Sequence, residues 1–190
     1  MARGYHDWLV AETAGALKTY AAPITPAVSF VPGDDGLCSL ENPAGSSVLL
    51  RIQRVFLFVD FVTTGFNFED AHVLVDRVSA PAGGALVTPS PHDSLDGDSV
   101  AVFRRRPTSI GSTLANLLGW HHFWFLNTVN LADKAALLYE PLEIYAHFAD
   151  GRRQPWTLRP TEALLLQVVP ADTGLLKFGS LIEYTEEPLG

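Results

Sequence analysis

From residue 36 onward, turn-forming residues divide the chain into short apolar segments. Asn42-Pro43-Ala44-Gly45, Asp150-Gly151 and Asp172-Thr173-Gly174 are the clearest of these divisions. Asn, Asp, Gly and Pro favour tight turns because each tolerates or fixes a turn conformation. Strand-like segments do not alternate regularly with helical ones, so parallel βα units are not expected. The pattern predicts an all-β protein of roughly eight to ten short antiparallel strands, arranged as a sandwich or barrel.

The strongest strand signal lies at residues 47–62. Val48, Leu50 and Ile52 alternate with Leu49, Arg51 and Gln53, as in a strand with one buried face. The alternation is lost at Arg54, and residues 55–59 are apolar on both faces. We therefore expect either a β-bulge near Arg54 or a strand end that is covered on both sides.

Other segments carry weaker strand signals. In residues 68–78, Ala71, Val73 and Val75 would share one face, and Asp70, His72 and Asp76 the opposite face. Residues 107–118 are ambiguous, and a helical turn is expected at 113–118. The remaining strands are expected at 36–40, 85–88, 99–105, 120–126, 136–139, 142–148, 156–158, 164–169 and 175–184.

The N-terminal segment differs in composition from the rest. Asp7 is suited to cap a helix, and the Ala-rich residues up to Tyr20 favour one, which Pro23 would end. We expect a helical or extended arm at residues 1–22 and one β-sandwich domain at residues 23–190. An arm folded back on its own domain is the alternative to an arm on a neighbouring subunit. The residues expected to contact the neighbour are Trp8, Leu9, Leu17 and Tyr20.

Composition narrows the set of partners. The chain has 13 basic and 21 acidic residues and a net charge of -8, which argues against nonspecific nucleic-acid binding. No apolar run approaches the length of a membrane helix, so no membrane partner is expected. Cys38 is the single cysteine, which excludes an intrachain disulfide and suggests a small buried side chain.

The polar residues do not form a recognisable catalytic pattern. His121 and His122 are adjacent, and neighbours in a strand point to opposite faces, so this pair cannot bind one metal ion. His92-Asp93-Ser94 contains the residue types of a hydrolase triad, but adjacent residues cannot orient one another in a relay. We expect no enzymatic activity, no cofactor and no bound metal.

Two clusters are candidates for contacts between subunits. The first is Arg104-Arg105-Arg106, which could pair with an acidic region of a neighbour such as Glu183, Glu186 and Glu187. A solvated strand end is the alternative. The second is the aromatic run from Trp120 to Phe125, because aromatic residues are favoured at protein interfaces. Burial on both sides within the chain is the alternative. The residues expected at this contact are Trp120, Phe123, Trp124 and Phe125.

Four stretches carry a resemblance to a known group of proteins. The chain resembles the small jelly-roll structural proteins of tailed bacteriophages, which include capsid decoration (cement) proteins. In such proteins an Asn-Pro-x-Gly-Ser turn leads into the first long core strand, and a Leu-Arg-Pro-x-Glu segment precedes a late one. Thr161 departs from the pattern, because such segments commonly carry Gly there. The stretches are Leu40–Ser46, Val48–Val55, Trp156–Leu164 and Ile182–Glu187.

The resemblance implies an antiparallel jelly-roll β-sandwich that forms a homotrimer on a capsid surface. The expected function is that of a virion structural protein, assembled in the host cytoplasm, that binds and stabilises the lattice of the major capsid protein or another virion protein. A tail-associated or lectin-like module, with Trp120, Trp124 and Trp156 stacking on glycan rings, is the alternative function.

Overall fold

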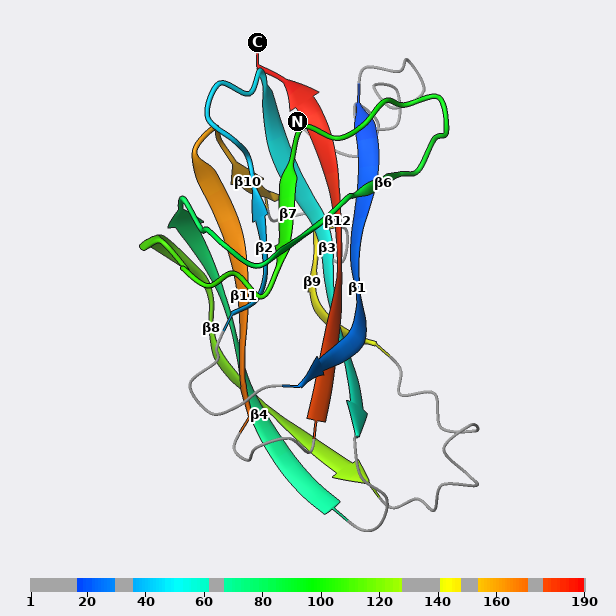
Figure 1. The fold of residues 1–190 in the computed structure, drawn as a ribbon, viewed down its shortest axis with the longest axis vertical. Coiled ribbons are helices and arrows are strands. Elements are labelled where there is room, and N and C mark those ends of the chain that lie inside the picture. The colour runs from blue at the N-terminus through cyan, green and yellow to red at the C-terminus, as the bar shows by residue number, and fades with distance from the viewer. Residues whose placement is uncertain are drawn as a thin grey trace.

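The computed structural model describes residues 17–29, 36–61, 67–127, 141–147, 154–170 and 176–189. Within these ranges the chain forms twelve β-strands in two antiparallel sheets, and almost no helix (Figure 1). The all-β prediction is therefore confirmed. None of the described residues belongs to a helix that is long and apolar enough to cross a membrane.

Sheet A has six strands in the order β10-β3-β12-β1-β6, with β9 paired to a second part of β3. Its strands are β1 (Lys18–Ser29), β3 (Val48–Phe61), β6 (Ser90–Pro91), β9 (Leu142–Ala146), β10 (Trp156–Leu158) and β12 (Leu176–Pro188). Sheet B has six strands in the order β5-β7-β2-β11-β4-β8. Its strands are β2 (Gly36–Glu41), β4 (Asn67–Ser79), β5 (Ala85–Val87), β7 (Val102–Arg105), β8 (Ser112–Asn127) and β11 (Glu162–Pro170).

The strand pairs are nested along the chain. The outermost pair is β1 with β12, followed inward by β2 with β11, β3 with β10, and β4 with β8. Successive pairs belong alternately to sheet A and sheet B. In these four pairs, strands from residues 18–79 run antiparallel to strands from residues 112–188, and the pairs belong to sheet A and sheet B in turn.

The hydrophobic core lies between the two sheets. Sheet A contributes fully buried residues such as Ile52, Leu57 and Ile182, and sheet B contributes residues such as Leu40 and Leu166. Removing apolar area from water is the main favourable term in folding, and large aliphatic side chains contribute most of that area here. Cys38 is part of this core, as expected for a small buried residue.

Several sequence predictions hold in detail. The pairing of β12 with β3 shifts register between Glu183 and Tyr184, which leaves Gln53 as an extra residue beside Arg54. This irregularity is the expected bulge. Ala71 and Val73 of β4 are fully buried, as the alternation predicted.

Two local predictions are wrong. Residues 113–118 form part of β8 instead of a helical turn. Lys18 and the residues up to Ala22, assigned to the arm, form the start of β1, so the β-domain begins by Lys18. Residues 1–16 and the strand expected at 136–139 lie outside the described residues.

Candidate interaction surfaces

Asn42 joins the two sheets at one end of the molecule. Its side-chain Nδ2 donates to the carbonyl oxygens of Val48 at 2.9 Å and Leu158 at 3.0 Å. Its backbone N–H donates to Glu162 O at 2.9 Å, and its carbonyl accepts from Thr161 N at 2.8 Å. Asn42 and Leu158 are fully buried, so the bond between them satisfies a carbonyl that water does not reach.

The turn at Thr161 is held in an unusual conformation. Thr161 has φ of +78°, in the left-handed region that favours glycine. The carboxylate of Glu162 accepts a hydrogen bond from Arg159 N at 2.8 Å, and Arg77 Nε lies 3.7 Å from the same oxygen. Thr161 therefore carries a backbone strain that glycine at this position would not.

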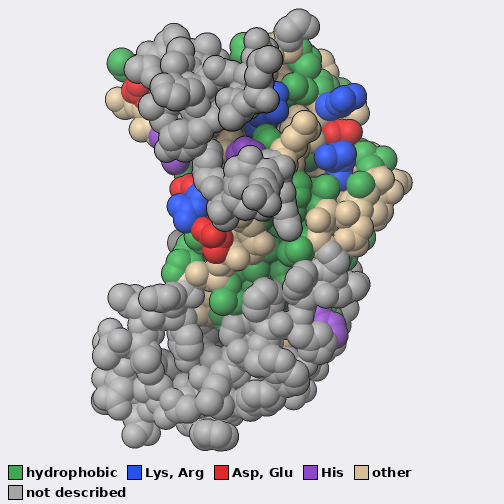
Figure 2. Space-filling model, turned by 180° about the vertical axis from the view of Figure 1, so that it is seen from behind, with side chains coloured by type: hydrophobic (Ala, Val, Ile, Leu, Met, Phe, Trp, Pro, Cys, Tyr) green, Lys and Arg blue, Asp and Glu red, His purple; other side chains and the backbone are tan. Residues whose placement is uncertain are grey.

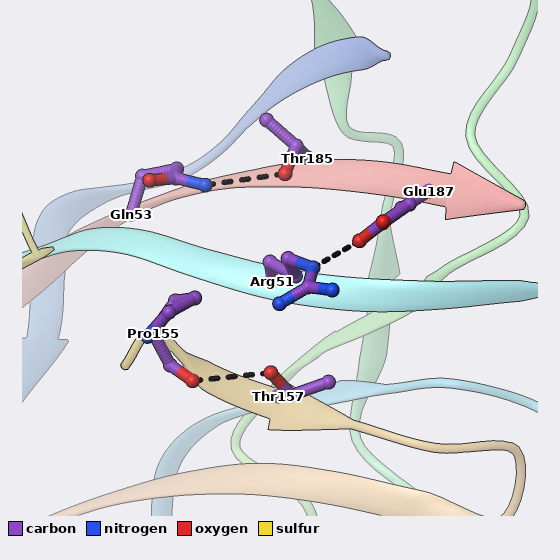
Figure 3. Close-up of polar contacts among 6 residues, drawn as sticks. All are labelled: Arg51, Gln53, Pro155, Thr157, Thr185 and Glu187. Carbon is purple, nitrogen blue, oxygen red and sulfur yellow. Dashed lines mark hydrogen bonds and ion pairs between the residues drawn. The ribbon is translucent and has the colours of Figure 1, made fainter. Parts of the chain in front are cut away.

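The outer face of sheet A carries ion pairs within the chain. Arg51 pairs with Glu187, as Figure 3 shows. Arg54 lies 2.7 Å from Glu143 on β9 and 3.9 Å from Glu183 on β12. These side chains are partly exposed, so each pair contributes little to stability. Figure 2 shows basic side chains directly next to acidic ones on one face of the molecule.

A second polar contact joins β3 and β12 of sheet A. Gln53 Nε2 donates to Thr185 Oγ1 at 3.1 Å, and both residues are buried (Figure 3). On the neighbouring strand β10, Thr157 Oγ1 donates to Pro155 O at 3.1 Å. Because Gln53 is the bulged residue of β3, this hydrogen bond ties the bulge to β12.

The arginine cluster extends over the end of β7. Arg104 Nη2 lies 3.7 Å from Glu41 of the adjacent strand β2. Arg105 and Arg106 are exposed, and Arg106 has φ of +51° at the end of the strand. Glu183 and Glu187, the acidic groups expected to receive these arginines from a neighbour, have arginine partners in their own chain. Pairing between subunits stays a prediction for Arg105 and Arg106.

Glu186, the third acidic residue of that region, is buried in a loop contact. Its Oε1 accepts from Ser99 Oγ at 2.6 Å and from Val100 N at 2.9 Å. Tyr184 OH lies 2.7 Å from the same Ser99 Oγ. The hydrogen bonds of this cluster hold the segment between β6 and β7 against β12.

Tyr20 belongs to the same cluster. Its ring stacks on that of Tyr184, with centroids 5.7 Å apart, and its hydroxyl donates to Gly97 O at 3.0 Å. Burial, together with the negative charges of Glu186, Asp96 and Asp98, raises the pKa of Tyr20 to about 12. Burial also raises the pKa of Tyr184. Tyr20 is fully buried in its own domain, so its expected role as a subunit contact is wrong.

The other predicted contact residues are placed only in part. Trp120, Phe123, Trp124 and Phe125 lie on β8, which forms one edge of sheet B, but their side chains fall outside the described part of the chain. Leu17 is half-buried directly before β1. Trp8 and Leu9 are outside the described residues.

Trp156, a candidate for glycan stacking, is engaged within the chain. Its ring stacks on that of Tyr145 with centroids 3.8 Å apart, and its backbone N–H donates to Tyr145 OH at 3.2 Å. One face of the indole is therefore occupied. Among the described residues, no group of three or more His, Cys, Asp or Glu side chains could hold a metal ion.

Comparison with protein-family models, curated proteins and solved structures found no match to this chain.

Proposed function

We propose that the chain is a jelly-roll structural protein of a bacteriophage virion, and that it decorates the assembled capsid. A jelly roll arises when a long antiparallel ribbon is rolled so that its strand pairs fall alternately in two sheets. The nested pairs β1–β12, β2–β11, β3–β10 and β4–β8, which alternate between sheets A and B, support this fold.

The observation that carries the proposal is the meeting of the resembling stretches at one end of the molecule. Asn42 of the first stretch bonds to Val48 of the second and Leu158 of the third. The fourth stretch lies in β12, where Glu187 pairs with Leu49. The stretches that carry the resemblance are therefore joined by direct contacts, as expected if they specify one common turn-and-strand arrangement.

Binding to an assembled lattice explains how such a protein would act without catalysis. A protein that binds the assembled capsid but not its free subunits stabilises the capsid by mass action. Each copy, in a homotrimer, would bury apolar area across a seam between capsid subunits.

Co-sedimentation tests this proposal. The purified chain is mixed with empty capsids assembled from the major capsid protein of the same phage, and with that protein before assembly. Saturable binding to capsids, with little binding to free subunits and a higher capsid melting temperature, is expected. Absence of capsid binding, together with binding on a glycan array, would overturn the proposal in favour of a glycan-binding module.

A further inference from the structure

The strand β8 forms a long edge of sheet B. It contains 16 residues and pairs with β4 on one side. Among the residues that the structure describes, no strand pairs with its other side. An edge strand presents a row of unpaired backbone N–H and C=O groups, which can accept another strand.

This edge lacks the chemical features that usually prevent strand addition. The sequence of β8, from Ser112 to Asn127, contains no Asp, Glu, Lys, Arg or Pro. Edges are commonly protected by charged residues, by proline or by short length. The opposite edge of sheet B is protected in this way, because β5 has three residues and its partner strand β7 ends in arginines.

The two halves of β8 differ in regularity. Register shifts interrupt its pairing with β4 at three places between Ser112 and His121, and such bulges twist an edge away from a partner. From His121 to Asn127 the pairing is continuous, residue by residue, with Asn67 to Val73. The second half therefore offers the regular backbone that a partner strand needs.

The charge distribution indicates what occupies this edge. The chain carries a net charge of -8, so two copies repel each other at most approaches, whereas β8 is free of charged residues. An antiparallel pair of identical strands also obeys a two-fold axis, so each edge satisfies the other and the contact itself involves only two copies.

We propose that residues 121–127 of β8 pair antiparallel with the same residues of a second copy, joining the two B sheets into one continuous sheet. This contact does not depend on the proposed capsid function. It is compatible with the proposed trimer, because a two-fold contact would link one trimer to the next.

Native mass spectrometry and hydrogen exchange of the full chain over a range of concentrations test the contact. We expect species related by a factor of two, and slower exchange of alternate amides in residues 121–127 as concentration rises. Residue 124 faces its own copy when residues 121–127 pair about a two-fold axis, so Trp124→Lys places two like charges directly opposite each other. This substitution should weaken the association about tenfold or more. Leu86→Lys adds the same charge on the opposite edge of the sheet, at a side chain 68% exposed, and should leave association unchanged.

Three results would overturn the edge contact. They are a mass that does not change with concentration, exchange in residues 121–127 that does not depend on concentration, and equal effects of the two lysine variants. The wild-type exchange measurement stands even where Trp124→Lys does not fold. A trimer without added protection in residues 121–127 would contradict the edge contact and leave the proposed capsid function standing. A dimer that does not bind capsids would contradict the capsid function and leave the edge contact standing.

Discussion

The side-chain amide of Asn42 donates to the carbonyl oxygen of Leu158 at 3.0 Å, across 116 positions of sequence. The same amide also binds Val48 O, so one buried side chain connects the ends of β2, β3 and β10. This contact matters for stability because the Leu158 carbonyl is buried, so water cannot replace Asn42 as its hydrogen-bond donor.

Asn42→Ala removes both side-chain hydrogen bonds and leaves two carbonyl oxygens without these donors. We expect a loss of about 2–4 kcal/mol in the free energy of unfolding, measured by urea denaturation. Asn116→Ala, at an exposed position of β8, is the matched control and should change stability by less than about 0.5 kcal/mol. Equal effects of the two substitutions would contradict the role of Asn42.

Thr161→Gly should stabilise the protein, because Thr161 has φ of +78° and an exposed side chain. Glycine adopts this conformation without the steric cost borne by a β-branched residue, and we expect a gain of about 0.5–1 kcal/mol in thermal or urea unfolding. Thr157→Gly, in the regular strand β10, should instead destabilise by a similar amount. Destabilisation by Thr161→Gly would contradict the strain assigned to this turn.

Gly111, directly before β8, lies close to the backbone of Ser79. It has φ of +72°, and a Cβ there would lie 1.7 Å from Ser79 O. Gly111→Ala should cost more than about 2 kcal/mol of unfolding free energy, since both conformation and space oppose a side chain.

Two other glycines separate the cost of the backbone conformation from the cost of the limited space. Gly45 has φ of +81° but nothing within 4 Å of an added Cβ, so Gly45→Ala should cost about 1 kcal/mol from conformation alone. Gly97 has open space and no positive φ, so Gly97→Ala should be near neutral. A cost at Gly111 no larger than that at Gly45 would show that the close approach to Ser79 is absent.

The raised pKa of Tyr20 predicts that the folded protein loses stability at alkaline pH. Its pKa is raised from 10.0 to about 12 in the folded protein, so the folded state retains this proton at a pH where the unfolded chain has lost it. Stability from this group is therefore complete below pH 10 and falls as pH rises through about 12. Urea unfolding across this range measures the fall, and Tyr20→Phe should make the pH dependence shallower. A Tyr20 that titrates at its ordinary pKa would contradict the burial of its hydroxyl.

Period-two alternation and turn residues were sufficient to predict the main strands of both sheets. They failed for β1, whose 12 residues include Pro23 and Pro26. Pro23 pairs with Leu181 on one side only, and the register of β1 shifts between Ile24 and Val28, around Pro26. Proline is tolerated at such irregular or open-edged positions, and sequence alone does not reveal which strand has them.

The alternation in β4 places Asp76 on the polar face of the strand but does not show whether that face is covered. Asp76 is 6% exposed in the structure, and burial raises its pKa. Nearby on this outer face of sheet B, Ile110 packs against Val78 and Leu165. A loop that covers a sheet from outside depends on tertiary packing, which alternation along one strand cannot predict. The cluster around Tyr20 and Glu186 was missed for the same reason, because its members come from distant segments.

The copy number of this chain in purified virions tests the central claim most directly. Quantitative mass spectrometry of phage particles, normalised to the major capsid protein, provides it. The account predicts a fixed ratio of this chain to the capsid protein, with one trimer for each decorated lattice position. Absence of the chain from purified particles, with the protein present only in the infected cell, would contradict the account.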